Sequence, residues 1–357
     1  MDQIAKNLKH ENPIVLITGG SGFLGKNLVK ELLDPNGPLV PDQIRVFDIK
    51  SYEGEYKNEI NFLQGDIQDY EKLARACEGV DLIIHAAAVI DWGTKDPSEV
   101  LSVNVGGTKN VIRACREQGV QNLIYTSSLD AVYTGKPLVN IDEDQDYPKK
   151  PHNAYCQSKL ESEQLVLKAD GPKLRTSVLR PSDIYGEEDP YHIDPLIKMA
   201  QSGFYTRLGN GKSKCQHVYV GNMAMAHVQL AKAMLQQNSK VFGKVYFITD
   251  GPGYNFFSFF DRIVIGAGYT LWPKNFWLPK ELALPMAGLT EFAAFLIRPF
   301  KRLNVKFSRF AVAYTCTDFT FSSKRAQQDF DFSPKYSVEE GLERTSAYYR
   351  GLNKSLK

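Results

Sequence analysis

The sequence predicts an α/β protein with a Rossmann-type, doubly wound parallel sheet and a smaller C-terminal substrate-binding lobe. Between Ile14 and about Arg180, short β-branched runs alternate with longer amphipathic stretches, which is typical of repeated βαβ units. A glycine-rich turn joins the first run to the first amphipathic stretch. Beyond Pro181 the pattern breaks into shorter pieces punctuated by Gly and Pro. We therefore assign residues 12–185 to the Rossmann domain and 186–357 mainly to the lobe, with some strands and helices returning to the sheet.

Local patterns predict the individual elements. Six β-branched runs predict strands at Ile14–Thr18, Ile44–Asp48, Asn61–Gln64, Leu82–Ala86, Leu123–Thr126 and Thr176–Leu179. The amphipathic stretches between them predict helices at Gly25–Leu33, Tyr70–Cys77, Val100–Gln118 and Tyr155–Leu167. In the lobe, a helix at Asn222–Leu235 and a strand at Val245–Ile248 are expected.

Composition excludes several classes of function. A chain with 43% hydrophobic and 11% aromatic residues can bury a core, so disorder is excluded as its main state. With 43 basic against 41 acidic residues and no basic run, no nucleic-acid partner is expected. The five cysteines include no Cys-x-x-Cys pair, so neither a disulfide framework nor a metal site is predicted. The polar N-terminus, Met1–Asn12, lacks the apolar core of a secretory signal, and a cytoplasmic location is expected.

One lobe segment, Leu282–Ile297, is strongly apolar but contains Glu291 and is shorter than the ~20 residues of a membrane-spanning helix. Basic residues follow it closely at Lys301, Arg302, Lys306 and Arg309. One interpretation of this pattern is peripheral membrane contact through Leu282–Ile297. A helix capping an apolar substrate cavity is the alternative of equal weight.

The turn Thr18–Gly25 reads Thr-Gly-Gly-Ser-Gly-Phe-Leu-Gly and lies between a predicted strand and a predicted helix. Glycines there permit a tight turn and let backbone N–H groups approach a pyrophosphate, so the cofactor-binding residues are expected to be Gly19, Gly22, Phe23, Leu24 and Gly25. A plain glycine-rich turn is the alternative. Asp48, roughly 20 residues past the loop, favours the dinucleotide site, because its carboxylate would accept from both ribose hydroxyls and repel a 2′-phosphate. The sequence thus predicts NAD as the cofactor and 12–185 as its domain.

Two further strand ends are expected to border the cofactor. Asp66 would accept from the adenine amino group and Ile67 would pack on the ring, although Asp66 could equally cap the following helix. Ala86 and Ala87 follow the fourth predicted strand, and their small side chains suit a backbone that passes close to the cofactor. His85 is expected to be a hydrogen-bonded packing residue.

Tyr155 and Lys159 stand four residues apart on a predicted helix, so both side chains project from one face. The phenol has an ordinary pKa near ~10 and is a poor base at neutral pH. Lowering that pKa by ~3 units takes about 4 kcal/mol, which the adjacent ammonium and an oxidised nicotinamide could supply. A solvated Tyr–Lys pair is the weaker alternative. The spacing predicts a proton-transfer pair that also holds the cofactor.

Other site residues follow strand ends. Ser128, with Ser127 as second choice, would hydrogen-bond the substrate oxygen. Asn104 would order a water path towards Lys159 or, with equal weight, satisfy a neighbouring backbone carbonyl. Pro181 and Ile184 follow the sixth strand and are expected to shape the nicotinamide pocket.

Four motifs together resemble the extended short-chain dehydrogenase/reductase superfamily, and they are the glycine loop, Ser127-Ser128, Tyr155-Cys-Gln-Ser-Lys159 and Arg180-Pro-Ser-Asp-Ile-Tyr-Gly186. More narrowly, Val218–Asn222 with His227 and Phe321–Ala326 are similar to the 3β-hydroxysteroid dehydrogenase family. Leu129-Asp130-Ala131 departs from that family's pattern. The resemblance implies a Rossmann domain with a closing lobe and assigns the family's Tyr, Lys and Ser roles to Tyr155, Lys159 and Ser128.

The leading hypothesis is therefore NAD-dependent oxidation of the 3β-hydroxyl of a steroid-like hydrophobic substrate. The aromatic-rich stretch Phe256–Trp277 would suit such a ligand, although core packing explains aromatics more often. Three alternatives remain, namely a decarboxylating sterol 4-carboxylate 3-dehydrogenase, a nucleotide-sugar epimerase or dehydratase, and a non-catalytic NAD-sensing protein. A homodimer is the expected assembly.

Overall fold

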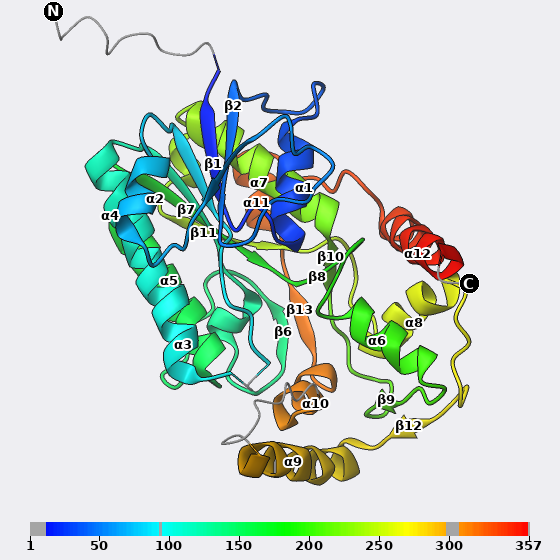
Figure 1. The fold of residues 1–357 in the computed structure, drawn as a ribbon. Helices are drawn as coiled ribbons and strands as arrows, with labels where there is room; N and C mark the ends of the chain where they lie inside the picture. Colours follow the sequence, from blue (N-terminus) through cyan, green and yellow to red (C-terminus); the bar gives the residue numbers. More distant parts are fainter. Residues whose placement is uncertain (1–11, 93–94, 298–306, 356–357) are drawn as a thin grey trace, which may run out of the picture.

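The computed structural model describes residues 12–92, 95–297 and 307–355. Its centre is a seven-stranded parallel sheet with the strand order β11-β7-β5-β4-β1-β2-β3 (Figure 1). The strands are β1 (Ile14–Thr18), β2 (Gln43–Asp48), β3 (Asn61–Gln64), β4 (Leu82–His85), β5 (Asn122–Thr126), β7 (Arg175–Pro181) and β11 (Lys244–Ile248). The order reverses between β1 and β4, as in a doubly wound Rossmann sheet. The predicted fold class and all seven predicted strands of this sheet are confirmed.

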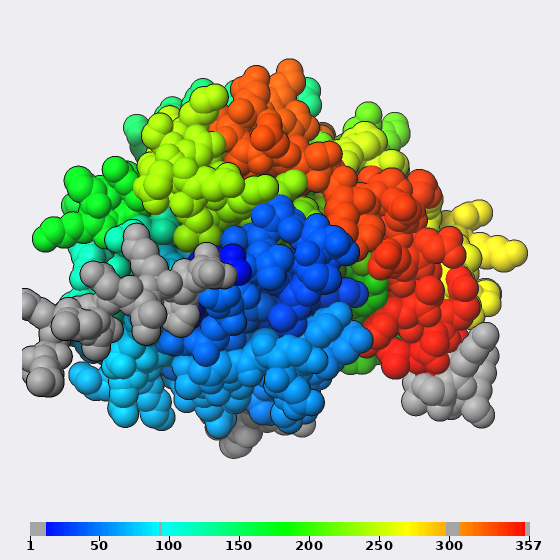
Figure 2. Space-filling model, turned by 90° about the horizontal axis from the view of Figure 1, so that it is seen from above, coloured from blue at the N-terminus to red at the C-terminus, as the bar shows by residue number. Residues whose placement is uncertain are grey.

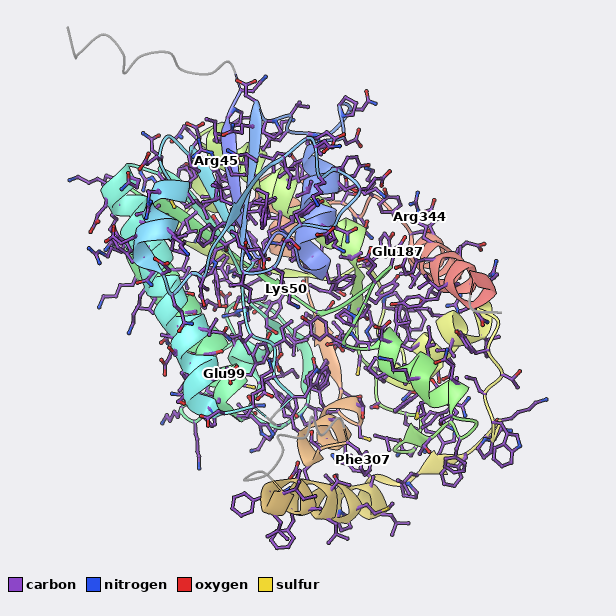
Figure 3. The ribbon with its side chains drawn as sticks, viewed as in Figure 1. Arg45, Lys50, Glu99, Glu187, Phe307 and Arg344 are labelled. Carbon is purple, nitrogen blue, oxygen red and sulfur yellow. The ribbon has the colours of Figure 1, made fainter. Side chains whose placement is uncertain are left out.

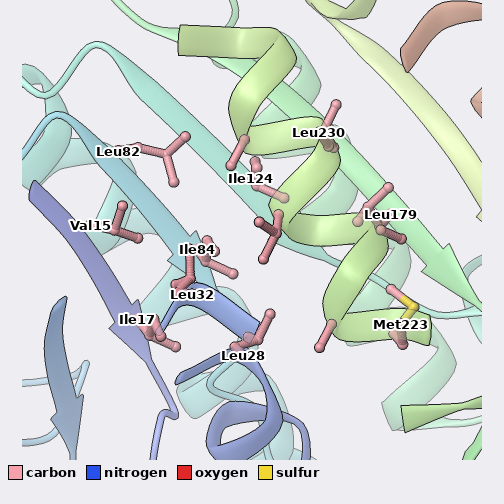
Figure 4. Close-up of a cluster of buried hydrophobic side chains, with 14 of the residues drawn as sticks. Val15, Ile17, Leu28, Leu32, Leu82, Ile84, Ile124, Leu179, Met223 and Leu230 are labelled. Atoms are coloured by element: carbon pink, nitrogen blue, oxygen red, sulfur yellow. The ribbon is translucent and has the colours of Figure 1, made fainter. Parts of the chain in front are cut away.

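Helices cover both faces of the sheet, because β1 buries every one of its side chains and alternates them between two cores. Val15 and Ile17 face α1 (Phe23–Leu32), α7 (Val220–Leu235) and α11 (Lys324–Phe330). Figure 4 shows these two side chains in one cluster with Leu28 of α1 and Met223 of α7. Ile14 and Leu16 face α2 (Tyr70–Ala76), α4 (Gly107–Gln118) and α5 (Ala154–Ala169). Both layers are therefore fixed by the two-residue period of one strand.

The predicted helix Val100–Gln118 is wrong as a single α-helix. It consists of α3 (Pro97–Leu101), a π-helical turn at Ser102–Gly106 and then α4. The π turn contains Asn104, whose side chain bonds to Val89 and Ser158 outside the helix. Such turns are rare and leave no periodic signal, so the apolar spacing could not reveal it.

The remaining chain forms the lobe below the sheet in Figure 1. Its short parallel pairs are β8 (Asp183–Tyr185) with β10 (His217–Tyr219), β9 (Arg207–Leu208) with β12 (Trp277–Leu278), and β6 (Leu138–Ile141) with β13 (Phe319–Phe321). Its α-helices are α6 (Ile193–Gln201), α8 (Phe256–Gly266), α9 (Lys280–Ile297), α10 (Arg309–Thr315) and α12 (Val338–Ser355), and it also holds the 3-10 turn Leu129–Val132. The other 3-10 turn, Ser239–Val241, packs on α7 and α11 beside the sheet. An aromatic core holds the lobe together. It includes Phe256, Phe257, Phe259 and Phe260 of α8, so these aromatics serve packing rather than a ligand.

The C-terminal part of the chain returns to the N-terminal part. Figure 2 shows the orange and red segments beside the blue ones on one surface. Lys335 Nζ donates to Glu31 Oε2 (2.9 Å) and Asp34 Oδ2 (3.1 Å), which ties the chain before α12 to the end of α1. Of the helices within the described residues, none combines the length and the apolarity needed to cross a membrane.

Candidate active site

A cavity of about 780 Å³ opens where the parallel strands end, at the point where the strand order reverses. One half is lined by the glycine loop and by residues that follow β2, β3 and β4. The other half is lined by residues of the lobe together with the ends of β5 and β7. All predicted cofactor and reaction residues except Asn104 therefore border one continuous space.

The glycine loop is built for close backbone approach. Gly19 has φ of +75°, and a Cβ there would lie 2.7 Å from the backbone of Ala87. A Cβ on Gly25 would overlap the carbonyl of Gly19. Gly22 precedes α1 and has no side chain that could cap the helix. The backbone N–H groups at the N-terminus of α1 are therefore open to an anion. Phe23 and Leu24 also line the cavity, and the residues present fit a pyrophosphate.

Asp48 borders the same half of the cavity at the end of β2. Its Oδ2 accepts from the Ser21 amide and its Oδ1 accepts from the Lys50 amide, each at 3.0 Å. These two bonds fix the carboxylate, and each oxygen keeps a lone pair for a ribose hydroxyl. The arrangement fits a cofactor without a 2′-phosphate.

The adenine-side residues Asp66 and Ile67 also line the cavity. Asp66 accepts from the backbone and side chain of Gln68, whereas the N-cap of α2 is Asp69, which accepts from the Lys72 amide. The alternative role of Asp66 as the helix cap is therefore wrong.

Ala86 and Ala87 border the cavity where the chain leaves β4. His85 is buried and bonds to Thr18 and Thr108 through its two ring nitrogens, and burial lowers its pKa to about 3. It is the packing residue that the sequence predicts.

Tyr155 and Lys159 lie one turn apart near the start of α5, and both side chains reach the cavity. Asn153 caps this helix by accepting from the Cys156 amide at 2.8 Å. Lys159 Nζ donates to the carbonyl of Thr126 at 2.9 Å and lies 5.9 Å from the Tyr155 ring centre. The helix thus brings the predicted pair together at the end of β5.

Burial sets the charge state of this pair. Burial lowers the pKa of Lys159 to about 8, against the pull of Asp130 and Glu163. Burial also raises the pKa of Tyr155 well above its usual value, and the charge of Asp130 adds to that rise. Burial and the charge of Asp130 therefore disfavour the phenolate, and the lowering of the Tyr155 pKa that the sequence predicts has to overcome both effects.

The two candidate serines have different surroundings. Ser127 Oγ donates to Glu163 Oε2 at 2.6 Å, and Glu163 pairs with the buried Arg180 behind the cavity wall. Ser128 Oγ donates to Asp130 Oδ2 at 2.8 Å, and both of these residues line the cavity. Ser127 lines the cavity as well, but its hydroxyl hydrogen is used by the Glu163 carboxylate of a buried ion pair, so Ser128 is the better candidate for the substrate oxygen.

Asn104 is used inside the protein. Its Oδ1 accepts from the Val89 amide at 2.7 Å, and its Nδ2 donates to the Val89 carbonyl and the Ser158 hydroxyl. This geometry favours the structural role over a water path, since it fastens the loop after β4 to α5. Pro181 and Ile184 line the same cavity as Tyr155 and Lys159.

The substrate half contains residues to which the sequence assigned no role in the site. Its aromatic wall is made by Trp92, Tyr191, Phe310 and Tyr314, with Trp92 edge-on to Tyr314 at 5.6 Å. Its buried polar residues include Asp130, Asp183 and His192. Tyr314 donates to Asp183 Oδ1 at 2.7 Å, although the two lie 131 residues apart. No local spacing could bring such residues together in advance. Among the described residues, no group of His, Cys, Asp and Glu is arranged to hold a metal ion.

A Rossmann fold whose cavity joins a glycine loop to a Tyr155, Lys159 and Ser128 constellation defines a short-chain dehydrogenase/reductase. Solved structures agree on the fold. A dTDP-glucose 4,6-dehydratase from Streptomyces venezuelae with NAD and TYD bound has a TM-score of 0.74 at 21% identity and covers 96% of this chain and 98% of that one. A UDP-glucose 4-epimerase from Thermotoga maritima with UDP-glucose has a TM-score of 0.71 at 21% identity, covering 96% and 100%. At these identities the similarity shows the fold alone.

The chain belongs to the 3-beta hydroxysteroid dehydrogenase/isomerase family, whose model matches residues 16–279. The mouse sterol-4-alpha-carboxylate 3-dehydrogenase, decarboxylating, is 32% identical over 341 residues, which cover 95% of this chain and 91% of that protein. The mouse 3 beta-hydroxysteroid dehydrogenase type 7 is 33% identical over 359 residues, covering 96% and 97%. The chain is therefore a dehydrogenase of this family.

Proposed function

We propose that this protein oxidises the 3β-hydroxyl of a sterol-like substrate to the ketone with NAD. The observation that carries the proposal is the placement of Tyr155, Lys159 and Ser128 between a dinucleotide-shaped half and an aromatic half of one cavity. A sugar nucleotide would not need the aromatic wall of Trp92 and Phe310, and the family supports a sterol rather than a sugar.

Each residue has a distinct task. Tyr155 takes the proton of the substrate hydroxyl as a general base. Lys159, held against the Thr126 carbonyl, stabilises the phenolate by its charge and binds the cofactor's ribose. Ser128 hydrogen-bonds the substrate oxygen. Bound NAD would supply the acceptor for the hydride that leaves the alcohol carbon, so that ketone, NADH and a proton are formed. Asp48 and the glycine loop would hold its ribose and pyrophosphate.

We also infer that α9 rests on a lipid surface. Its outer face leaves Leu289, Phe292 and Phe295 between 59% and 69% exposed, and Leu282 is 58% exposed. Its inner face packs Ala283 and Ala287 on Val312 of α10, and Figure 3 shows Phe307 between these two helices.

The neighbourhood of α9 favours a lipid over a protein partner. Close to β12, Phe204, Trp272 and Phe276 form an exposed aromatic cluster, with ring centres 5.5 and 6.1 Å apart, and such aromatics are typical of membrane interfaces. The opposite side of α10 lines the cavity with Phe310 and Tyr314. One short helix thus separates the apolar face from the substrate half, which suits a substrate that dissolves in the bilayer.

A substrate panel tests the catalytic proposal. The full chain is incubated with NAD, or NADP as a control, and with pregnenolone, a 3β-hydroxy-4-carboxysterol or UDP-glucose. Growth of NADH absorbance with a sterol and NAD is expected. Turnover of UDP-glucose alone, or of no compound, would contradict the proposal, and carbon dioxide release with the carboxysterol would identify the decarboxylating variant.

A further inference from the structure

The hydroxyl of Ser128 has both of its protein hydrogen bonds with one residue. Its Oγ accepts from the backbone N–H of Asp130 at 3.1 Å and donates to Asp130 Oδ2 at 2.8 Å. A serine hydroxyl has one hydrogen and two lone pairs. One lone pair is used by the amide, so the proton state of the Asp130 carboxyl decides what Ser128 offers to the cavity.

The Ser128 hydroxyl therefore has two states, one for the ionised and one for the protonated carboxyl of Asp130. If Asp130 is ionised, the Ser128 hydrogen points to the carboxylate and only a lone pair faces the cavity. A substrate alcohol would then give its hydrogen to Ser128 instead of Tyr155, and a ketone would find no donor. If Asp130 is protonated, its O–H donates to Ser128, and the Ser128 hydrogen is free to bond the substrate oxygen.

We propose that Asp130 is a positioning residue that must carry a proton for turnover, because the proton turns Ser128 into a donor towards the substrate oxygen. The proposal rests on the proposed dehydrogenase function and adds to it a second proton requirement. Proton transfer to the substrate remains the task of Tyr155.

The surroundings of Asp130 support the protonated form. Its side chain is 8% exposed, and its other oxygen, Oδ1, has among the described residues only the distant thiol of Cys156 at 3.8 Å. Burial raises the pKa of Asp130 to about 6, and the neighbouring charge of Asp183 adds to the rise. An apolar substrate that displaces water would raise this pKa further.

Several other titratable groups surround Asp130. Lys159 opposes protonation by its charge, whereas Asp183 favours it. An ionised Asp130 raises the pKa of the Tyr155 phenol, so a proton on Asp130 also makes the phenolate easier to form. Among the described residues, the titratable groups that interact with Asp130 are Tyr155, Cys156 and Lys159 of α5, Asp183 of β8, Tyr314 of α10, and Tyr133 after the 3-10 turn.

The test is the pH dependence of ketone reduction, in which both Tyr155 and Ser128 must donate. The kcat/KM for NADH-dependent reduction of 5α-androstan-3-one, or of the ketone that the substrate panel identifies, is measured between pH 5.5 and 8.5. Wild-type kcat/KM should fall about tenfold per pH unit above the pKa of Asp130. Asp130→Asn, whose amide N–H replaces the carboxylic O–H as donor to Ser128, should lack this fall. Asp183→Asn, a matched control, should keep the fall and move it to lower pH, since a charge that raises the Asp130 pKa is gone.

Two results would overturn the proposal while leaving the dehydrogenase function intact. One is a loss of at least a hundredfold at every pH in Asp130→Asn that still binds NADH, which would show that the ionised carboxylate is needed. The other is an unchanged pH dependence in that variant. If Asp130→Asn does not fold, ¹³C NMR titration of the wild-type carboxyl replaces it, and a pKa that does not rise on ketone binding overturns the proposal. A wild type that turns over no substrate would refute the proposed function and this inference together.

Discussion

Lys159 donates a hydrogen bond from Nζ to the carbonyl oxygen of Thr126, 2.9 Å away, and so ties α5 to the last residue of β5. An ammonium has three N–H donors, so two remain for the phenol and the cofactor's ribose. The bond explains how a flexible side chain keeps a fixed position at 3% exposure. It also holds the buried charge of Lys159 beside Tyr155, and burying this charge lowers the stability of the fold.

Replacing Lys159 with Met should therefore abolish turnover and yet stabilise the fold. Burial lowers the pKa of Lys159 from 10.5 to about 8, which corresponds to a penalty of about 3 kcal/mol for the charged form. The variant also loses the hydrogen bond to Thr126, which contributes about 1 kcal/mol to stability. The free energy of unfolding should therefore rise by about 2 kcal/mol at pH 7. Because the folded protein prefers the neutral amine, the penalty is fully present below about pH 8 and disappears as the pH rises towards 10.5. Urea unfolding of both proteins at pH 7 and pH 9.5 measures the difference in the free energy of unfolding. A variant that is less stable than the wild type at pH 7 would refute the claim that the buried charge of Lys159 destabilises the fold.

Ser127 and Ser128 provide a matched pair of variants. Ser128→Ala should lower kcat/KM by about 10²–10³-fold, because it removes the group that bonds the substrate oxygen. Ser127→Ala should leave turnover close to wild type but cost about 1–3 kcal/mol of stability, since it removes a bond to the buried Glu163 carboxylate. Kinetics and thermal unfolding of the two variants check this, and the reverse assignment of the two effects would show that the wrong serine has been placed at the substrate.

Asp48→Asn should weaken NAD binding by about tenfold and improve the relative use of NADP. The substitution removes a charged acceptor for the ribose hydroxyls, worth about 1.5 kcal/mol, and also the repulsion of a 2′-phosphate. Protein fluorescence titrations with each cofactor provide the dissociation constants. Glu53→Gln is the control, because Glu53 is an exposed carboxylate of the same segment that pairs with Lys57. An unchanged NAD to NADP ratio in Asp48→Asn would mean that Asp48 does not select the cofactor.

The double variant Leu289→Ser/Phe292→Ser should lose binding to liposomes of phosphatidylcholine and phosphatidylserine while keeping its turnover of a soluble steroid. Both side chains lie on the exposed face of α9, so their loss removes apolar contact without touching the core. Ile265→Ser, at an equally exposed apolar position on α8, is the control. Co-sedimentation compares the three proteins. If α9 instead joined two copies of the chain, the double variant would change the oligomeric state seen by sedimentation, and liposome binding would be unaffected.

Much of the fold could be predicted because its signals are local. Each β-branched run and the glycine turn is a pattern that spans only a few consecutive residues. In the same way, a single helical turn places Tyr155 and Lys159 on one face. The two-residue period of β1 likewise determines both layers of helices.

Other features could not be predicted, because they depend on distant contacts. Asp183 meets Tyr314 across 131 residues, and neither position carries a pattern of its own. Phe259 and Trp92 are equally aromatic in the sequence, yet the first lies in the lobe core and the second lines the cavity. Whether Ser127 or Ser128 faces the substrate depends on where Glu163 and Asp130 lie, which only the folded structure shows.

The most direct test of the account is the turnover of Tyr155→Phe, which removes one hydroxyl and keeps the ring. NADH formation from the sterol that the wild type oxidises best is measured at pH 7.5, and NAD binding is measured in parallel. We predict that NAD binding stays close to the wild-type value while NADH formation is lost to background. NADH formation at a rate close to wild type would contradict the role of Tyr155 as the base, and with it the proposed chemistry of this site.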